Sequence, residues 1–119
     1  MPRNTRKLGT EYEQLAAAYL EEEGMHILEH SFRCRFGEID LVADDLGTLV
    51  FVEVKYRIGV GAGSPEDSVT YRKQRTISKV SDYYRLKKQI PDDVPCRYDV
   101  VAIDGNEIRH IRDAFWYTI

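Results

Sequence analysis

The hydrophobic and polar positions of the chain follow two different periods. Apolar side chains recur at helical spacing in an early stretch that ends at Gly24 and in a later one that ends before Ile90-Pro91. Their stripes are Leu8, Tyr12, Leu15, Ala16, Tyr19 and Leu20 in the first stretch, and Ile77, Val80 and Tyr84 in the second. The second helix is predicted to start at Ser64-Pro65-Glu66-Asp67, or a little later at Thr70 with Lys73 three residues on.

Between and after these helices the pattern changes to the two-residue period of strands. Strands are predicted from about Met25 to Arg33, around Gly37–Leu41, around Val50–Lys55, from Tyr98 to Ile103 and from Ile108 to Ile111. A loop is expected from about 58 to 65, and a turn at 104–106 closes a second hairpin. Three consecutive strands with helices before and after them indicate an α/β or α+β sheet. The 119 residues are expected to form one domain, 1–119.

Four ionisable residues interrupt the second and third predicted strands. Glu38 and Asp40 share one face of the second strand, and Glu53 and Lys55 share one face of the third. An unpaired charge inside an apolar strand is costly unless a metal, an ion partner or a substrate compensates it. These positions therefore predict a site.

A hairpin would bring the two pairs together. A turn within residues 45–48 places Asp40 opposite Glu53 and Glu38 opposite Lys55. Converging carboxylates, with the main-chain carbonyl between Glu53 and Lys55, supply the oxygen ligands that Mg²⁺ or Mn²⁺ prefers. The ammonium of Lys55 could then orient a water molecule on the metal or neutralise a phosphate.

The order and spacing of these residues resemble a nuclease signature. Asp40 followed by Glu53-Val54-Lys55 is similar to the D…(D/E)-x-K pattern of the PD-(D/E)XK nucleases, whose restriction-endonuclease-like fold is a mixed β-sheet flanked by helices. More closely, the chain resembles the YraN-like family of small bacterial proteins. The matching stretches are Gly9…Glu13-x-x-Ala16, Gly37–Leu41, Phe51–Lys55 with Arg57, Lys73-Gln74 and Arg97–Val101. The resemblance implies an endonuclease with Mg²⁺ or Mn²⁺ that hydrolyses phosphodiester bonds in DNA, including branched or processed DNA.

The resemblance also implies roles for the site residues. Asp40 and Glu53 are expected to hold the metal, and Lys55 to orient water or stabilise charge. Glu13, at the edge of the first apolar stripe, is expected to complete the metal site as an auxiliary ligand or base partner. The structural alternative for Glu13 is an ordinary half-exposed helix carboxylate.

Two further acidic residues have two interpretations each. Glu38 is either a metal ligand or a salt-bridge partner that positions Lys55 directly or through Arg57. Asp99, which occupies a family position in the strand 98–103, is interpreted as a structural ion-pair partner of Arg97 or of a basic residue in the second helix.

Charge is unevenly distributed along the chain. The net charge of −3 is unusual for a nucleic-acid-binding domain, but residues 66–88 carry seven basic and three acidic side chains. The residues expected to contact nucleic acid are Arg57, Arg72, Lys73, Gln74 and Lys79. The alternative is a charged helix face that is merely solvated. Analogy with nucleases that cut both strands of DNA suggests a homodimer.

The remaining patterns exclude several classes. Cys34 and Cys96 have no metal-binding spacing, which favours a reducing, cytoplasmic setting. No apolar run approaches the roughly 20 residues of a membrane span, and the first residues lack the apolar region of a signal peptide, so no membrane contact is expected. His26 and His30 lie in a predicted strand, which argues against histidine ligation. Glycines within 59–63 suggest a mobile lid.

Two other functions remain alternatives to a nuclease. The first is a non-catalytic nucleic-acid-binding or protein-interaction module that has kept the fold. The second is a core ion-pair network, which would bind no divalent cation and would lose much stability when one partner is removed.

Overall fold

The structure is a computed structural model that describes residues 5–57 and 69–119, without the side chains of residues 5–7 and 57. Its elements are α1 (Thr5–Glu22), β1 (His26–Cys34), β2 (Gly37–Asp45), β3 (Thr48–Arg57), α2 (Tyr71–Lys87), β4 (Cys96–Asp104) and β5 (Glu107–Phe115). The expected lid within 59–63 and the earlier predicted helix start at 64–67 lie outside the described residues.

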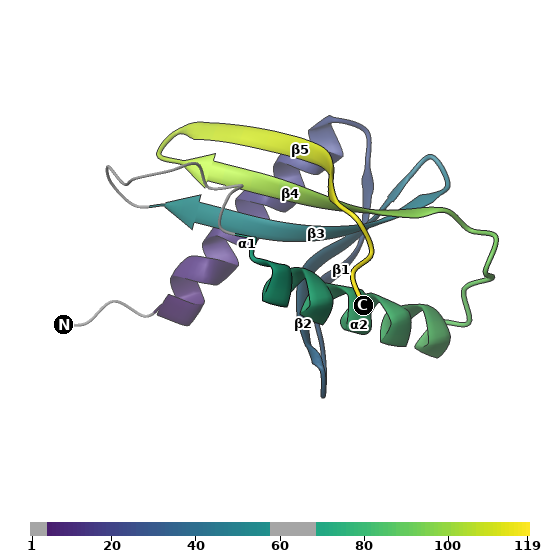
Figure 1. Cartoon of the computed structure of the whole chain (residues 1–119). Helices are drawn as coiled ribbons and strands as arrows, with labels where there is room; N and C mark the ends of the chain where they lie inside the picture. The colour runs from purple at the N-terminus through teal and green to yellow at the C-terminus, as the bar shows by residue number, and fades with distance from the viewer. Residues whose placement is uncertain (1–4, 58–68) are drawn as a thin grey trace.

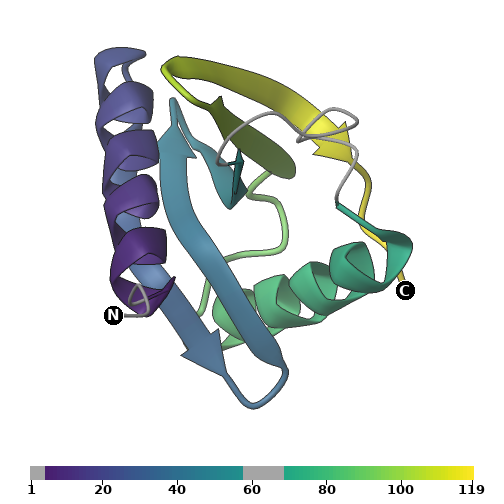
Figure 2. The same ribbon diagram turned by 90° about the vertical axis from the view of Figure 1, so that its left-hand side faces the viewer.

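The strands form one mixed sheet in the order β1-β2-β3-β4-β5. Neighbouring strands are antiparallel except β3 and β4, which are parallel because the chain passes through α2 between them. The two helices lie on opposite sides of this sheet, as Figures 1 and 2 show. This α+β arrangement confirms the predicted fold class and is consistent with a restriction-endonuclease-like fold.

Each helix covers its own apolar layer. One layer joins α1 to the sheet through Ala16, Ala17, Leu20, Leu41, Val50, Val52 and Val101, and the other joins α2 to it through Phe32, Ile39, Phe51, Ile77, Val80, Tyr84 and Tyr98. The predicted stripe of α2 is confirmed. The stripe of α1 needs one correction, because Leu15 is 50% exposed and Ala17 is buried in its place.

The later of the two predicted starts of α2 is confirmed. Thr70 is the N-cap residue, and its side chain accepts a hydrogen bond of 3.1 Å from the main-chain N–H of Lys73. This bond satisfies one of the main-chain donors that the first helical turn leaves without a partner. It therefore fixes where the basic face of α2 begins.

The side-chain alternation of β2 breaks at Asp40. Ile39 and Val42 both belong to the layer under α2, although residues three apart in a regular strand point to opposite faces. Leu41 lies in the layer under α1, and the neighbouring strand carries Ser31 with a positive φ of 52°. Irregularities of this kind re-aim side chains. Here the irregularity turns the Asp40 carboxylate toward α1.

Two minor expectations concern cysteines and membranes. Cys34 is half-buried, Cys96 is exposed, and both are free. Among the described residues, no helix is both long enough and apolar enough to cross a membrane.

Candidate metal centre

The predicted register of the β2–β3 hairpin is confirmed as far as the two strands pair. Their ladder runs from Asp45–Thr48 to Leu41–Val52 and ends there, so the expected direct pairs of Asp40 with Glu53 and of Glu38 with Lys55 lie beyond its last rung. The Asp40 carboxylate instead accepts a hydrogen bond of 2.8 Å from the main-chain N–H of Val54. Asp40 therefore occupies the fork where the strands separate.

Three carboxylates from different parts of the chain converge at this fork. Ligand oxygens of Glu13, Glu38 and Asp40 all lie within 4.8 Å of one another. Glu13 reaches the fork from α1, and the Ser31 hydroxyl donates a 2.6 Å hydrogen bond to its Oε1. We call Glu13, Glu38 and Asp40 the carboxylate cluster. Of the four residues expected as metal ligands, this cluster brings together three and does not include Glu53.

The carboxylate cluster is electrostatically strained. Burial raises the pKa of Asp40 to about 8, with repulsion from Glu53 as the next cause. Burial also raises the pKa of Glu13, and repulsion from Asp40 and Glu38 adds to this effect, while the Ser31 hydrogen bond opposes it. A divalent cation between these groups would reverse the sign of their mutual interaction.

Glu38 has an ion partner that the sequence did not predict. Arg33 donates from Nε to Glu38 Oε2 at 2.6 Å, across the β1–β2 pair. The partner is therefore Arg33 rather than Lys55, and the side chain of Arg57 is outside the described residues. The Arg33 and Glu38 side chains are 57% and 34% exposed, so this pair lies at the solvent rim of the fork.

Glu53 borders the carboxylate cluster without belonging to it. Its side chain is 7% exposed, and its Oε2 lies 3.9 Å from Nζ of Lys73 at the start of α2. Lys73, predicted to contact nucleic acid, thus approaches a buried carboxylate. Lys55 is half-buried, and among the described residues its ammonium has no carboxylate within ion-pair distance.

The other residues expected to contact nucleic acid differ in orientation. Arg72 and Lys79 are exposed on α2. Gln74 points into the fold, where its Nε2 donates to the Val69 carbonyl at 3.1 Å and its Oε1 accepts from the Thr118 hydroxyl at 3.5 Å. Its amide therefore ties α2 to flanking segments and does not reach the carboxylates.

The carboxylate cluster fits a hard divalent cation by its chemistry. Its donors are carboxylate oxygens, which Mg²⁺ and Mn²⁺ prefer. The bonds to Ser31, Arg33 and the Val54 N–H each engage one named oxygen of a carboxylate, on Glu13, Glu38 and Asp40 respectively. Two oxygens on opposite sides of Mg²⁺ lie about 4.2 Å apart. The cluster is close to that size.

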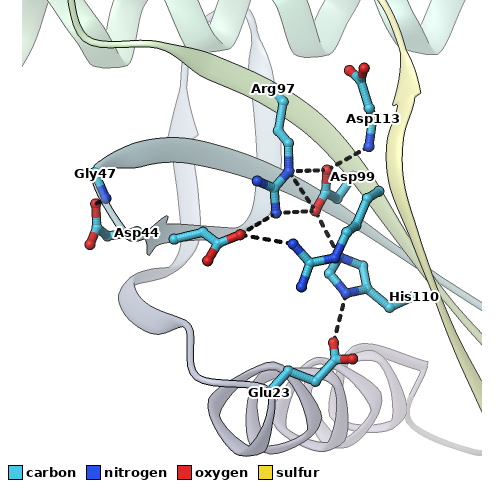
Figure 3. Close-up of polar contacts among 9 residues, drawn as sticks. Glu23, Asp44, Gly47, Arg97, Asp99, His110 and Asp113 are labelled. Atoms are coloured by element: carbon cyan, nitrogen blue, oxygen red, sulfur yellow. Dashed lines mark hydrogen bonds and ion pairs between the residues drawn. The ribbon is translucent and has the colours of Figure 1, made fainter.

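A second group of charges lies near the C-terminal end of α1 (Figure 3). Asp99 is fully buried and accepts hydrogen bonds from Arg97 Nε at 3.0 Å and from the Asp113 N–H at 2.9 Å. Its Oδ2 lies 2.7 Å from His110 Nε2. The predicted ion pair of Asp99 with Arg97 is confirmed, whereas the part played by His110 was not predicted.

This Asp99 network extends to the surface through three more residues. His110 Nδ1 lies 2.7 Å from Glu23 Oε1, and Asp45 Oδ2 binds Arg97 at 2.8 Å and Arg112 at 2.9 Å. Burial would raise the pKa of Asp99, but its bonds to His110 and Arg97 lower it. Burial would lower the pKa of His110, but the carboxylates of Asp99 and Glu23 raise it. The acidic side chains of this network are therefore paired with basic side chains of the protein itself.

Sequence reasoning missed Ser31, Arg33 and His110. A signal existed for the first two, because a two-residue turn at Arg35-Phe36 aligns the predicted first strand with the acidic strand and sets Arg33 opposite Glu38. His110 carried no such signal, since its partners come from β4 and from the residue after α1.

Comparison with known proteins gives consistent matches along the chain. A family model described as "Uncharacterised protein family UPF0102" matches residues 12–103, which include the carboxylate cluster, Glu53 and Lys55. A UPF0102 protein of Lachnoclostridium phytofermentans is 49% identical over 94% of this chain and 95% of its own length. Those of Persephonella marina and Syntrophus aciditrophicus are 45% and 50% identical, over 90% and 93% of this chain and 91% and 87% of their own lengths.

Proposed function

We propose that this chain, which belongs to the uncharacterised protein family UPF0102, is a divalent-metal-dependent nuclease that hydrolyses phosphodiester bonds in DNA. The family is YraN-like and has a PD-(D/E)XK-like nuclease fold. Because one fold can serve many functions, the proposal depends on the site and not on the fold.

The observation that carries the proposal is the convergence of Glu13, Glu38 and Asp40 within 4.8 Å, next to buried Glu53. Burial and like-charge repulsion make this arrangement unfavourable, as the raised pKa of Asp40 indicates. Perturbed carboxylates that gather at one point are typical of functional sites. A bound cation is the simplest compensation.

In this proposal, different residues of the chain have different roles in hydrolysis. Glu13, Glu38 and Asp40 would hold the cation, with Glu53 beside them as a further carboxylate. When bound, the cation supplies Lewis-acid stabilisation of the charge that develops on the phosphate. Ser31, Arg33 and the Val54 N–H orient the three carboxylates.

Lys55 acts on the substrate in this proposal. Its ammonium is not used in a described ion pair, so it can orient the attacking water and stabilise charge on the phosphate. Water forms a new bond to phosphorus, the bond from phosphorus to the leaving oxygen breaks, and the leaving oxygen takes up a proton. Exposed cations on α2, including Arg72 and Lys79, supply phosphate contacts.

A homodimer and a cytoplasmic setting belong to the same proposal. Two-fold symmetry would let two sites act on the two strands of a duplex, by analogy with other nucleases. Free Cys34 and Cys96 are compatible with a reducing compartment.

The test is cleavage of labelled linear duplex, single-stranded, flap and four-way-junction DNA with Mg²⁺ or Mn²⁺. Cutting should disappear with EDTA and in folded Asp40→Asn and Lys55→Ala proteins. Lys55→Arg, which keeps a positive charge, should retain part of the activity. Asp93→Asn, an exposed carboxylate in the connection before β4, is the matched control and should cut like the parent.

The rival function is a non-catalytic binding or interaction module. It would be supported by a protein that cuts none of these substrates with either metal and shows no Mn²⁺ binding by calorimetry. Metal binding without cutting of DNA would redirect the search to other phosphodiesters, beginning with RNA.

A further inference from the structure

A groove of about 490 Å³ lies between the β1–β2 turn and the second half of α2. It is lined by Arg35, Phe36, Lys79, Asp82, Tyr83 and Leu86. Figure 1 shows the β1–β2 hairpin passing beside α2 with its tip beyond the helix, and Figure 2 shows the same two elements from the side. We call this feature the Phe36 groove.

The Phe36 groove presents aromatic and apolar surface to solvent. Phe36 is 42% exposed, and its ring centroid lies 6.2 Å from that of Tyr83 at an interplanar angle of 67°. The guanidinium of Arg35 lies 4.8 Å from the Phe36 centroid. Leu86 is 80% exposed on the opposite wall. Tyr83 packs against the core that lies under α2, whereas Phe36 and Leu86 are outside that core, so burial in the core does not account for the apolar character of these two exposed residues.

The position of Phe36 is fixed by the residue that follows it. Gly37 has a φ of 146°, and a Cβ placed there would lie 2.7 Å from the Thr76 side chain. The turn can therefore lie this close to α2 only with glycine at position 37. Glu38 of the carboxylate cluster comes next in the chain, so the groove and the candidate metal centre share the first residues of β2.

The charges around the groove are those that attract a phosphate chain. Arg72, Arg75 and Lys79 are exposed and follow one another at spacings of three and four residues, which places them along one side of α2. This row leads from the helix start, where Lys73 approaches Glu53, to the groove. The one acidic residue of the lining, Asp82, accepts a hydrogen bond from the Tyr117 hydroxyl.

We propose that the Phe36 groove binds an unpaired nucleobase of the substrate strand, stacked on Phe36 and Tyr83, with its flanking phosphates on Lys79 and Arg35. Aromatic faces next to a cationic track are how proteins hold single-stranded nucleic acid without reading its sequence. A base that is paired inside a duplex cannot enter such a groove. The inference rests on the proposed nuclease function and narrows its substrate to DNA with a single-stranded segment at the cleavage point.

The test measures binding apart from cleavage. The Asp40→Asn protein in EDTA is titrated with a fluorescent single strand of about 12 nucleotides, and separately with the matching duplex. Phe36→Ala should weaken binding of the single strand by about 5- to 150-fold, the range for loss of one base–aromatic stack, and change duplex binding little. Phe36→Tyr should restore the affinity. Leu46→Ala, at the exposed β2–β3 turn, is the control and should bind like the parent.

A second variant separates stacking from apolar contact. Phe36→Leu keeps an apolar side chain but loses the aromatic face, so it should resemble Phe36→Ala. A 2-aminopurine moved along the oligonucleotide should be quenched at one position by the parent and not by Phe36→Leu. Parental affinity for the single strand in Phe36→Leu would overturn the inference, because apolar contact without an aromatic face would then be sufficient. Unchanged affinity in Phe36→Ala, or no binding of the single strand, would also overturn it.

Failure of this inference is distinguishable from failure of the nuclease proposal. If the wild-type protein cuts with Mg²⁺ and Phe36→Ala cuts overhang and duplex in the parental ratio, the nuclease stands and the groove assignment falls. If the single strand binds through Phe36 and no substrate is cut, the groove stands and the nuclease proposal falls.

Discussion

The carboxylate cluster and the Asp99 network are two groups of acidic side chains near α1, and they differ in what neutralises them. The pKa of Asp99 is lowered, whereas that of Asp40 is raised to about 8. Burial by itself acts to raise the pKa of both aspartates. The difference therefore comes from the neighbours: Asp99 is bound by Arg97 and His110, and Asp40 faces Glu53 and Glu38.

This difference separates a structural role from a functional one. A buried charge whose ion-pair and hydrogen-bond partners are supplied by the fold needs no ligand, and it contributes to the native arrangement. Partly buried carboxylates that mainly face one another lack sufficient positive partners, and they favour a cation from solution. The same residue type in the same sheet can thus be assigned to opposite roles by its partners alone.

The largest expected effect is on the Asp99 network. Asp99→Asn removes the charge that Arg97 and His110 share in a buried position, so the free energy of unfolding should fall by about 3–5 kcal/mol. Urea denaturation followed by circular dichroism measures this change. Asp93→Asn should stay within about 0.5 kcal/mol of the parent. If Asp99→Asn lowered the free energy of unfolding no more than the control does, the structural role assigned to the Asp99 network would be contradicted.

In the carboxylate cluster, replacing the central aspartate by asparagine should change the free energy of unfolding in the opposite direction. Asp40→Asn relieves repulsion in the fork, so the unfolding free energy without metal should rise. Mn²⁺ at about 100 times its dissociation constant should stabilise the parent by about 2.7 kcal/mol and Asp40→Asn much less. Thermal unfolding with and without Mn²⁺ provides the comparison. An equal response of both proteins to Mn²⁺ would place the metal elsewhere.

The pH dependence of stability distinguishes the two regions further. Asp40 and His110 both have raised pKa values in the folded state, so their contributions are fully present below the ordinary values of 3.8 and 6.5 and are lost as the pH rises through the folded values. The contribution of Asp99 is instead present above 3.8 and lost as the pH falls further. The protein should be less stable at about pH 8.5 than at about pH 5.5.

Asp40→Asn should reduce this decline, because of these two groups only His110 then still takes up a proton on folding in this pH range. Urea titrations at the two pH values test the expectation. An identical decline in the parent and in Asp40→Asn would show that the Asp40 carboxyl ionises normally in the folded protein.

The smallest expected effect belongs to Arg33 at the solvent rim. Because its pair with Glu38 is largely exposed, Arg33→Ala should change the unfolding free energy by no more than about 1 kcal/mol. The affinity for Mn²⁺, measured by calorimetry, should rise modestly, since Glu38 no longer shares its charge with Arg33. A marked fall in affinity would instead make Arg33 an essential positioning residue.

Local pattern made much of the fold and part of the site predictable. The period of the apolar residues predicts both helices and all the strands, and a turn within residues 45–48 gives the register that brings Asp40 and Glu53 to the same end of the hairpin. Thr70 and Lys73 predict the start of α2 by a local hydrogen bond.

What could not be predicted depends on contacts between distant segments. The positive φ of Ser31, which accompanies the change of face at Asp40, is unusual for serine and leaves no mark in the sequence pattern. The partners of His110 come from β4 and from the end of α1. The Phe36 groove likewise forms only when the β1–β2 turn meets α2.

The span of the Glu23–His110 contact, 87 residues, has a consequence for how the chain acquires its structure during synthesis. Asp99 leaves the ribosome before His110 and Asp113, which supply part of its neutralisation. Until β5 has emerged and docked, the middle of β4 would bury an incompletely paired charge. The complete sheet is therefore expected to form late and cooperatively, and pairing of β4 with β5 is expected to be the last step before the native state.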